Sequence, residues 1–475
     1  MKADTSNVPD GLVVWPKSVS GCGILCGVSG ELLIRGEIVT MDESRRVISD
    51  GAVVSVEGRI AFVGDAADAV DRYPSAAVLG GPSSIVTPGL INAHQHLTGD
   101  RLIRSCIPED IDSDESIFSW AVPVHAEHTP DDDELTATLG AAEAVLNGVT
   151  TIIEAGTVAH VDRVARALGA LGLRARVGRW GWDIDDAPHA APTDEVLQLQ
   201  REVLDLLPAG GLVESGVTLV GHDLMSDALV SGAADLARER GVGMTMHISP
   251  HRRDPQSYLD RVGVRPIVHF DRLGVLGRHL LLAHAVHLDA NEAELVVGSG
   301  SAVASCPWAY LRLAQGFQAN HRHDWIRSNG GRLALGTDSE NAGDAIDILR
   351  TASLFVGLVR DRSEDHLSMT SADGFALATI DGAEAVGLGD TVGSLEVGKR
   401  ADIVVHDATR LELTPRGTDL VRQLVWAADG RSVVDVVVDG RVVVRDGRVV
   451  TVDLQPFVDA AVERQRFMLS RVGRP

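Results

Sequence analysis

Lysine is almost absent from this chain of 475 residues. Lys2, Lys17 and Lys399 are the only lysines, so arginine supplies nearly all of the 43 basic residues. An active site formed by the middle of the chain therefore has no amine available. This excludes Schiff-base chemistry there, and it excludes a carboxylated lysine that bridges two metal ions.

Aromatic residues, positive charge and cysteine are also scarce. Aromatic side chains make up 4% of the chain and the net charge is −24, so we expect neither nucleic acid nor an anionic membrane surface as a partner. Four cysteines cannot form a disulfide framework in a chain of this length. Cys22 and Cys26 have no second cysteine pair, which argues against a structural zinc site.

The sequence has no long apolar run. An uncharged stretch of about 18 residues, as a transmembrane helix requires, does not occur. The first residues lack the basic, apolar and small-residue order of a secretory signal. We therefore expect a cytoplasmic protein that acts on a small molecule.

The chain is organised in three zones. Strand-like segments with Asp-Gly and Glu-Gly turns occur near both ends of the sequence, which predicts one small β-sandwich domain built from both chain ends. Between them, apolar strands alternate with helical stretches, as in βα units around a parallel sheet. The expected domains are 1–87 for the first part of the composite β-sandwich, 88–390 for the catalytic barrel, and 391–475 for the second part of the sandwich with a terminal helix.

The middle zone predicts an α/β fold, a (β/α)8 TIM barrel. Eight strands in about 300 residues fit a closed barrel better than an open sheet. One helix is clearly marked by the Thr129-Pro130 start, an acidic first turn and a stop at Gly148. The expected strands are 85–96, 149–155, 173–182, 216–223, 241–249, 279–286, 301–306 and 332–338.

Histidines and one aspartate mark the ends of several of these strands. His94 and His96 are two residues apart on the first strand, so both imidazoles face one side. His247 ends the fifth strand, His284 the sixth and Asp338 the eighth. In a closed barrel these strand ends meet at one mouth, where three histidines and a carboxylate suit Zn²⁺ or a similar divalent ion.

These residues lie in motifs that resemble the metal-dependent amidohydrolase superfamily. The motifs are PGLINAHQH, NGVTTIIEAGT, MHIS, LAHAVHLDANE, LGTDSE and GSLEVGKRADIVV. The resemblance implies a barrel with a composite β-sandwich, a homo-oligomer, and one divalent ion held by His94, His96, His247 and Asp338. Zn²⁺ is the first expectation, and Co²⁺, Fe²⁺ and Mn²⁺ also accept this ligand set.

The resemblance also implies a mechanism. Hydroxide on the metal is the nucleophile, and Asp338 accepts the proton of the attacking water and later delivers it to the leaving group. His284 orients the hydroxide or stabilises the tetrahedral intermediate. His287 lies an odd number of residues further on and should point to the other face of its strand.

One position departs from the family pattern. Deaminases and triazine hydrolases of this superfamily usually carry a glutamate three residues after the histidine of the fifth strand, and this acid protonates a ring nitrogen of the substrate. Here the position is Pro250, which cannot donate a proton. His251, Arg252 or Arg253 could replace the missing acid, although a charge run of this kind is more often a solvated loop.

The missing acid favours substrates whose carbonyl oxygen the metal itself can polarise. We therefore expect hydrolysis of a urea, amide, carbamate or thiocarbamate, such as a phenylurea or thiocarbamate herbicide, and the chain looks most like the phenylurea and thiocarbamate (molinate-type) hydrolases. The alternative within the family is an aminohydrolase or chlorohydrolase of a nitrogen heterocycle. An alternative of another class is a catalytically inactive scaffold.

Further pocket residues are expected at the other strand ends. Either Arg179 or the tryptophans beside it face inward from the third strand, and His222 ends the fourth strand at the substrate. Trp308 is expected to form an apolar wall with Cys306. Phe118 and Trp120 belong to a long segment between His96 and Thr129, which should line an apolar substrate pocket.

Overall fold

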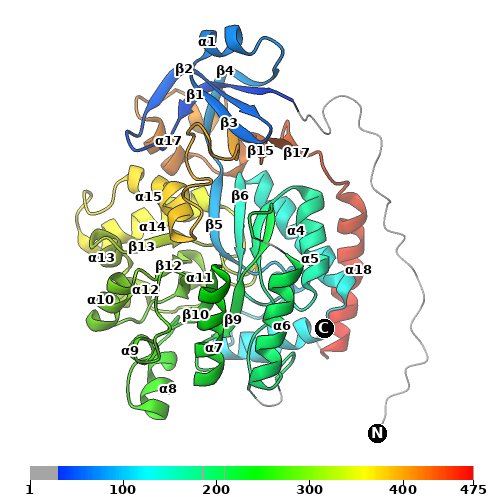
Figure 1. Ribbon diagram of the computed structural model, residues 1–475, viewed down its shortest axis with the longest axis vertical. Helices are drawn as coiled ribbons and strands as arrows, with labels where there is room; N and C mark the ends of the chain where they lie inside the picture. The colour runs from blue at the N-terminus through cyan, green and yellow to red at the C-terminus, as the bar shows by residue number, and fades with distance from the viewer. Residues whose placement is uncertain (1–29, 185–186, 208, 474–475) are drawn as a thin grey trace.

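The computed structural model describes residues 30–184, 187–207 and 209–473. A sheet-rich end contains both flanks of the sequence, and a larger body holds short parallel strands surrounded by helices (Figure 1). Cys22 and Cys26, for which we expect no metal site, lie outside the described residues. No described helix is long and apolar enough to span a membrane.

One mixed sheet of eight strands joins the two flanks of the sequence, in the order β17-β16-β15-β14-β4-β1-β2-β3. Its central seam is the antiparallel pairing of β14 with β4, where Val404 lies opposite Thr87. The strands expected to form a β-sandwich are thus hydrogen-bonded into one sheet. They are β1 (Leu32–Val39), β2 (Val47–Val56), β3 (Arg59–Asp65), β4 (Ala77–Pro88), β14 (Ile403–Asp407), β15 (Val433–Val438), β16 (Arg441–Arg445) and β17 (Arg448–Val449).

Alternating side chains make both faces of this sheet apolar. On β1, Ile34 packs into one core cluster and Leu33 into the other, which includes Ala66 of helix α1. The β2–β3 hairpin turns at Glu57 and Gly58, which both have positive φ, 51° and 78°. Such a turn matches the twist of the two strands and favours glycine.

The body contains two parallel sheets whose strands follow one another in chain order. The four-stranded sheet has the order β5-β6-β7-β8 and the five-stranded sheet runs from β9 to β13. These strands are β5 (Leu90–Gln95), β6 (Val149–Glu154), β7 (Arg174–Val177), β8 (Val213–Ser215), β9 (Val217–Gly221), β10 (Met244–Ile248), β11 (Leu280–His284), β12 (Ala302–Ser305) and β13 (Arg332–Leu335).

Backbone hydrogen bonds connect the two parallel sheets at both junctions. Only Gly216 separates β8 from β9, and its N–H donates to the carbonyl of Val177 over 3.0 Å. At the other junction, Thr337 and Asp338 donate to the carbonyl of His94 over 3.1 and 3.0 Å. The carboxyl ends of β5 and β13 therefore lie side by side.

Two expected strands differ from the structure. The segment 85–96 is divided between β4 and β5, which belong to different sheets. The segment 173–182 is strand only as far as Val177. The alternation rule that we applied beyond Val177 therefore does not hold there.

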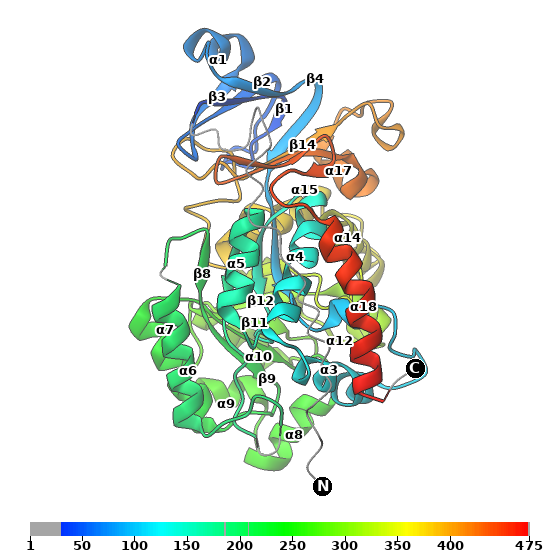
Figure 2. The same cartoon turned by 90° about the vertical axis from the view of Figure 1, so that its right-hand side faces the viewer.

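Helices surround the parallel strands, and further helices lie beyond the carboxyl ends of these strands (Figures 1 and 2). They are α1 (Ala66–Arg72), α2 (Ser113–Ser116), α3 (Val122–Ala126), α4 (Pro130–Leu146), α5 (Val161–Leu171), α6 (Thr193–Leu206), α7 (Asp227–Arg240), α8 (Arg253–Val262), α9 (Pro266–Arg272), α10 (Ala290–Ser299), α11 (Pro307–Arg312), α12 (Phe317–Asn320), α13 (His323–Ser328), α14 (Ile348–Ser363), α15 (Ser371–Ala378), α16 (Ile380–Ala385), α17 (Leu420–Ala427) and α18 (Gln455–Arg471). Short helical turns are η1 (Asp100–Ile103), η2 (Ile117–Ala121), η3 (Leu411–Leu413) and η4 (Gly430–Ser432).

The acidic first turn of α4 does more than complement the helix dipole. Thr129 and Asp132 form a capping box, which stabilises the start of the helix. The Asp132 carboxylate also accepts two hydrogen bonds from Arg464, at 2.6 and 2.7 Å. This pair holds the C-terminal helix α18 along α4 (Figure 2).

Candidate metal centre and active-site pocket

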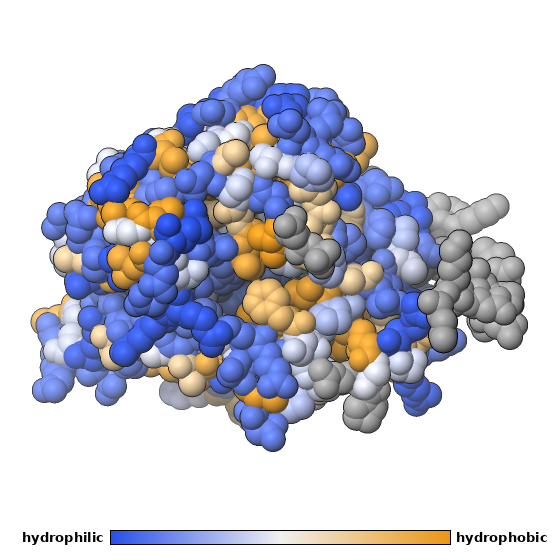
Figure 3. Space-filling model, turned by 90° about the horizontal axis from the view of Figure 1, so that it is seen from below, coloured by the Kyte–Doolittle hydropathy of each residue, from blue (hydrophilic) through white to orange (hydrophobic). Residues whose placement is uncertain are grey.

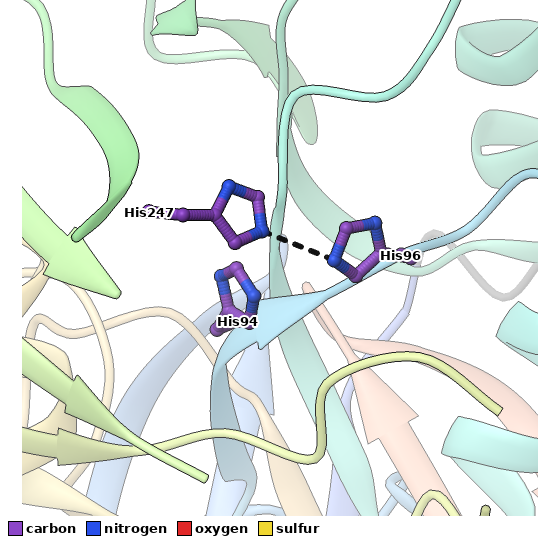
Figure 4. A group of neighbouring side chains, drawn as sticks. All are labelled: His94, His96 and His247. Atoms are coloured by element: carbon purple, nitrogen blue, oxygen red, sulfur yellow. Dashed lines mark hydrogen bonds between the residues drawn. The ribbon is translucent and has the colours of Figure 1, made fainter. Parts of the chain in front are cut away.

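Three histidines from two strands converge at the carboxyl end of the parallel sheets. Figure 4 shows His94 and His96, from the end of β5, with their rings beside that of His247 from β10. The Nε2 atoms of His96 and His247 are 3.2 Å apart. The ring centroids of His94 and His247 are 4.8 Å apart.

Asp338 and His284 complete the cluster. Asp338 follows β13, and its Oδ1 lies 3.3 Å from Nε2 of His96 and 3.6 Å from Nε2 of His94. Its other oxygen, Oδ2, lies 4.0 Å from Nδ1 of His284. The structure thus brings together the four predicted metal ligands and His284, the predicted catalytic histidine.

Hydrogen bonds fix the ring orientation of two of the histidines. Nδ1 of His247 donates to the carbonyl of Val220 over 2.6 Å, so its Nε2 faces the cluster as an acceptor. Nδ1 of His96 lies 3.1 Å from the hydroxyl of Thr157, which itself donates to Glu154. The hydroxyl therefore accepts from His96, whose Nε2 also faces the cluster.

The donor set fits a divalent ion. Four ligands around tetrahedral Zn²⁺ with bonds of about 2.0 Å would lie roughly 3.3 Å from one another. The measured separations among His96, His247 and Asp338 include 3.2 and 3.3 Å. Both ring nitrogens of His94 are buried and have no hydrogen-bond partner within the described residues, which a cation at this point would remedy.

The protonation states of three of the four ligands agree with this fit. Burial opposes protonation of His96, but the Asp338 carboxylate raises its pKa to about 9, so binding of an ion would displace a proton from this ring. Burial lowers the pKa of His94, and burial with neighbouring histidines holds that of His247 well below its usual value, so both rings are neutral. Burial opposes ionisation of Asp338, but His94 and His96 hold the pKa of its carboxyl well below the usual range. Neutral imidazoles and a carboxylate are the forms that bind a metal.

A further histidine, His222, lies beside the cluster and pairs with a carboxylate. Nδ1 of His222, at the end of β9, lies 2.8 Å from Oδ2 of Asp254 in α8. The His222 ring stacks on that of His247, with centroids 5.4 Å apart. Burial opposes protonation of His222, but the Asp254 carboxylate raises its pKa above the usual value.

A pocket of about 270 Å³ opens in front of these residues. His96, His247, His284, Asp338 and His222 form its floor, and Asp254 lies behind His222. Most other walls are apolar, and Figure 3 shows apolar residues gathered around a hollow in this face of the molecule. They include Ile107, Ile117, Phe118, Val122, Trp180, Trp182 and Leu313.

Three of the expected substrate-binding residues lie elsewhere. Arg179 is outside the pocket, because its guanidinium donates to the carbonyl of Ala159 over 2.7 Å. Trp120 is buried in a core cluster with Phe457 of α18. Trp308 lies under the guanidinium of Arg350, at a neighbouring cavity of about 890 Å³. These three predictions are corrected, whereas Phe118 and His222 do line the pocket.

The structure also places the residues around Pro250. Pro250, His251 and Arg253 line the pocket, and Arg252 is not among its lining residues. Arg253 pairs with Asp114 of α2, a helix in the long segment that follows β5. His287 points away, and its Nε2 bonds to the carbonyl of Gln315 over 2.8 Å.

Trp180 and Trp182 line the pocket after β7, so of the two alternatives at this strand end the tryptophans are the ones that face inward. Other pocket residues had no signal that we used. Asp254 is 32 residues from His222 along the chain, so only the fold brings them together. His125 and Asp100 lie in the long segment after β5, for which we named other residues.

Comparison with known proteins settles the family. A model of the amidohydrolase family matches residues 85–443. The chain belongs to the amidohydrolase family. It is 30% identical to a 5-methylthioadenosine/S-adenosylhomocysteine deaminase from Syntrophobacter fumaroxidans, over 94% of this chain and 98% of the relative. A deaminase of the same name from Natronomonas pharaonis is 33% identical, over 88% and 93% of the two chains.

Solved structures give the same result. An adenosine deaminase from Xanthomonas campestris with bound zinc superposes with a TM-score of 0.86, at 27% identity, over 93% of this chain and 98% of that one. Atrazine chlorohydrolase from Arthrobacter aurescens, complexed with zinc, has the same fold, with a TM-score of 0.84 at 24% identity over 91% and 100% of the two chains.

These findings confirm part of the prediction. This amidohydrolase is an enzyme that acts on C–N bonds. Its His/Asp cluster supports a divalent metal ion, such as the zinc bound in the adenosine deaminase. Triazine hydrolases share the fold of this chain. The relatives are named as deaminases, which does not support the narrower likeness to phenylurea or thiocarbamate hydrolases.

Proposed function

We propose that the protein hydrolyses an amino group, or a comparable leaving group, from a ring carbon of a nitrogen heterocycle. The ligands of its single ion are His94, His96, His247 and Asp338, at the mouth of a closed (β/α)8 barrel. The observation that carries the proposal is the His222–Asp254 pair beside the cluster, because it supplies a proton donor that Pro250 cannot. The deaminase names of relatives that span nearly the whole chain support it.

A bound ion would supply Lewis-acid chemistry, because it would lower the pKa of water toward about 7 and polarise the bond under attack. Asp338 has one oxygen, Oδ2, directed toward His284 and away from the other histidines, so this atom accepts the proton of the attacking water. The same atom then delivers a proton to the leaving amine. His284, buried at the pocket floor with a pKa lowered to about 3 by burial, stays neutral and orients the water.

His222 protonates the ring. Its Nδ1 is engaged by Asp254, so Nε2 is the atom that can face a substrate nitrogen. Adding a proton to that nitrogen makes the neighbouring carbon electrophilic enough for attack by water. The side chains of Trp180, Trp182 and Phe118 exclude water and offer faces on which a flat heterocycle can pack.

A carbonyl substrate is the second candidate. Pro250 favours it, because a urea, amide, carbamate or thiocarbamate needs no ring protonation. We rank it second, because His222 offers a replacement acid and the relatives carry deaminase names. Family membership gives no support to an inactive scaffold. A cytoplasmic location and a homo-oligomer stay predictions.

The test is product analysis on a paired panel. Metal-loaded protein is incubated with amino- and chloro-substituted purines, pyrimidines and triazines, and with aryl ureas, carbamates and thiocarbamates. Mass spectrometry should detect heterocycles in which a hydroxyl group has replaced the amino or chloro substituent. Cleavage confined to the carbonyl compounds would refute this proposal in favour of hydrolysis of a urea, amide, carbamate or thiocarbamate.

A pair of variants tests the role of His222. His222→Gln should lower kcat on an active heterocycle by about 10²- to 10⁴-fold, the usual contribution of a general acid, with unchanged metal content. Adding Pro250→Glu to that variant should restore part of the activity, because it places a carboxylic acid at the family position. A fully active His222→Gln variant would refute the proton transfer.

A further inference from the structure

Two buried side chains with unused nitrogens form one wall of the pocket. His125 in α3 and Trp180 after β7 both line it, and they are only 6% and 4% exposed. Three nitrogens have no hydrogen-bond partner within the described residues: both ring nitrogens of His125 and Nε1 of Trp180. Burying such groups without a partner destabilises a fold, so each calls for an explanation.

We propose that His125 and Trp180 form a subsite that binds a neutral oxygen acceptor of the substrate, such as a ring carbonyl or a hydroxyl group. The inference rests on the proposed function, because the same pocket would hold the heterocycle. The two rings meet edge to face, with centroids 5.3 Å apart and planes at 82°. In the proposed subsite, one acceptor lies where the two rings meet, bonded to a donor on each.

The subsite is built to hold the His125 ring in place. Gly99 has a φ of 84°, and a Cβ atom there would lie only 1.7 Å from Nε2 of His125. The close approach of this ring to the backbone thus requires glycine. Oδ2 of Asp100 is 3.9 Å from the same nitrogen, which is beyond hydrogen-bond distance.

The chemistry of the two rings selects an uncharged group. Burial, with the nearby His128 and His96, holds the pKa of His125 well below its usual value, so the ring is neutral. Trp180 offers a donor only. Arg253 is the one arginine among the lining residues of the pocket, and it pairs with Asp114. No cation is therefore free to compensate a carboxylate or a phosphate at this wall, as far as the described residues go.

The chain offers a matched control in Trp182. It lines the same pocket and is 1% exposed, but its Nε1 donates to the carbonyl of Pro188 over 2.7 Å. Its N–H is thus already satisfied by the protein. A ligand oxygen should change the environment of the Trp180 N–H and leave that of Trp182 nearly unchanged.

The experiment follows the indole N–H signals of the ¹⁵N-labelled, metal-loaded protein by NMR. Trp180→Phe and Trp182→Phe assign the two signals among the seven tryptophans. The probes are 2-pyridone, which carries a neutral carbonyl, benzoate, which is anionic, and benzene, which has no acceptor. The expected result is a saturable downfield shift of the Trp180 signal with 2-pyridone, and a much smaller one with benzoate or benzene at equal concentration.

Affinity gives a second measurement. Trp180→Phe should weaken binding of 2-pyridone by about 2- to 10-fold, the value of one hydrogen bond, and should leave binding of benzene within twofold. His125→Phe should have a similar effect. If Trp180→Phe fails to fold, the affinities of His125→Phe for 2-pyridone and for benzene decide instead: equal changes for the two probes would overturn the subsite.

The outcomes separate the subsite from the proposed function. A Trp180 signal that does not move with 2-pyridone, or that moves equally with benzene, would overturn the subsite and indicate that water alone satisfies the two rings. If Trp180 responds but no heterocycle is hydrolysed, the subsite stands and the proposed function fails. Hydrolysis of heterocycles without a Trp180 response would overturn the subsite alone.

Discussion

At the residue scale, the backbone around the metal site is unusual. His222, Ser249, His284 and Asp338 are not glycines, yet they have positive φ values between 49° and 74°. Each such residue costs of the order of 1–3 kcal/mol unless the surroundings enforce it. All four lie where a strand has just ended or is ending, and three of them, His222, His284 and Asp338, line the pocket. These positions therefore lower the free energy of unfolding, and the surrounding structure holds them in place.

Removing one histidine of the cluster should remove the metal. In His94→Ala, the remaining donors no longer enclose the ion, so bound metal measured by mass spectrometry should fall well below one equivalent and activity should fall at least 10³-fold. His287→Gln is the control, because that histidine bonds to a backbone carbonyl outside the cluster. Full metal content and activity in His94→Ala would contradict the assigned ligands.

The residues of the site that lie at the end of a strand were predictable, and those further along the chain from a strand end were not. His94, His96, His247 and Asp338 end or follow apolar strands, and the barrel pattern alone places such ends together. Arg179 was placed wrongly, because β7 stops at Val177 and the alternation rule stops with it. The partner of His222 depends on α8, whose position no local pattern fixes.

At the element scale, the loop after β6 contacts a metal ligand that follows β5. Thr157 links Nδ1 of His96 to the buried Glu154, which ends β6. The hydroxyl group thus fixes which nitrogen of His96 faces the ion. Supporting groups of this kind commonly contribute 10- to 100-fold to metal affinity.

Thr157→Val should weaken metal binding without emptying the site at high metal concentration. The side chains have nearly the same shape, but valine cannot accept the hydrogen bond from His96. We expect the dissociation constant for Zn²⁺, measured by competition with a chelator, to rise by about 10- to 100-fold. Thr136→Val, which alters a hydroxyl bonded within α4, is the control. Equal affinities in the two variants would exclude this role.

The seam between β14 and β4 contains a buried histidine that ties stability to pH. Burial lowers the pKa of His406 to about 4, against 6.5 in the unfolded chain. The unfolded state therefore binds the proton more readily between pH 6.5 and 4, and stability falls as pH falls through that window, by about 1.4 kcal/mol per unit. Above pH 6.5 this contribution is complete.

His406→Gln should flatten that dependence. Glutamine keeps polar contacts with Ser432 and Thr87 but does not titrate. Urea unfolding at pH 7, 6 and 5 should show a smaller loss of unfolding free energy in the variant, by up to about 2 kcal/mol at pH 5. The same loss in both proteins would mean that His406 does not titrate on unfolding.

At the scale of the whole molecule, the last helix is part of the structure around the active site. Arg464 of α18 binds the nearly buried Asp132 through two hydrogen bonds, and Phe457 packs on Trp120 in the segment that also carries Phe118. Much of this arrangement was predictable, since both flanks read as strands and a terminal helix was expected. Its contacts were not, because they join residues more than 300 positions apart.

Arg464→Ala should loosen this helix. It leaves a carboxylate almost buried and unpaired, which should lower the free energy of unfolding by about 1–3 kcal/mol, given that the arginine itself is partly exposed. Calorimetry measures the change, and limited proteolysis should cut within α18 first. Arg466→Ala, at an exposed position of the same helix, should behave as the wild type.

The pairing of β14 with β4 has a consequence for synthesis on the ribosome. About 300 residues separate the two strands, so at about 5–20 residues per second β4 waits roughly 15–60 s for its neighbour. During that time the nascent chain presents an open, apolar strand edge, which is a template for association with other chains. We therefore expect that a chaperone which binds exposed strand edges raises the yield of folded protein.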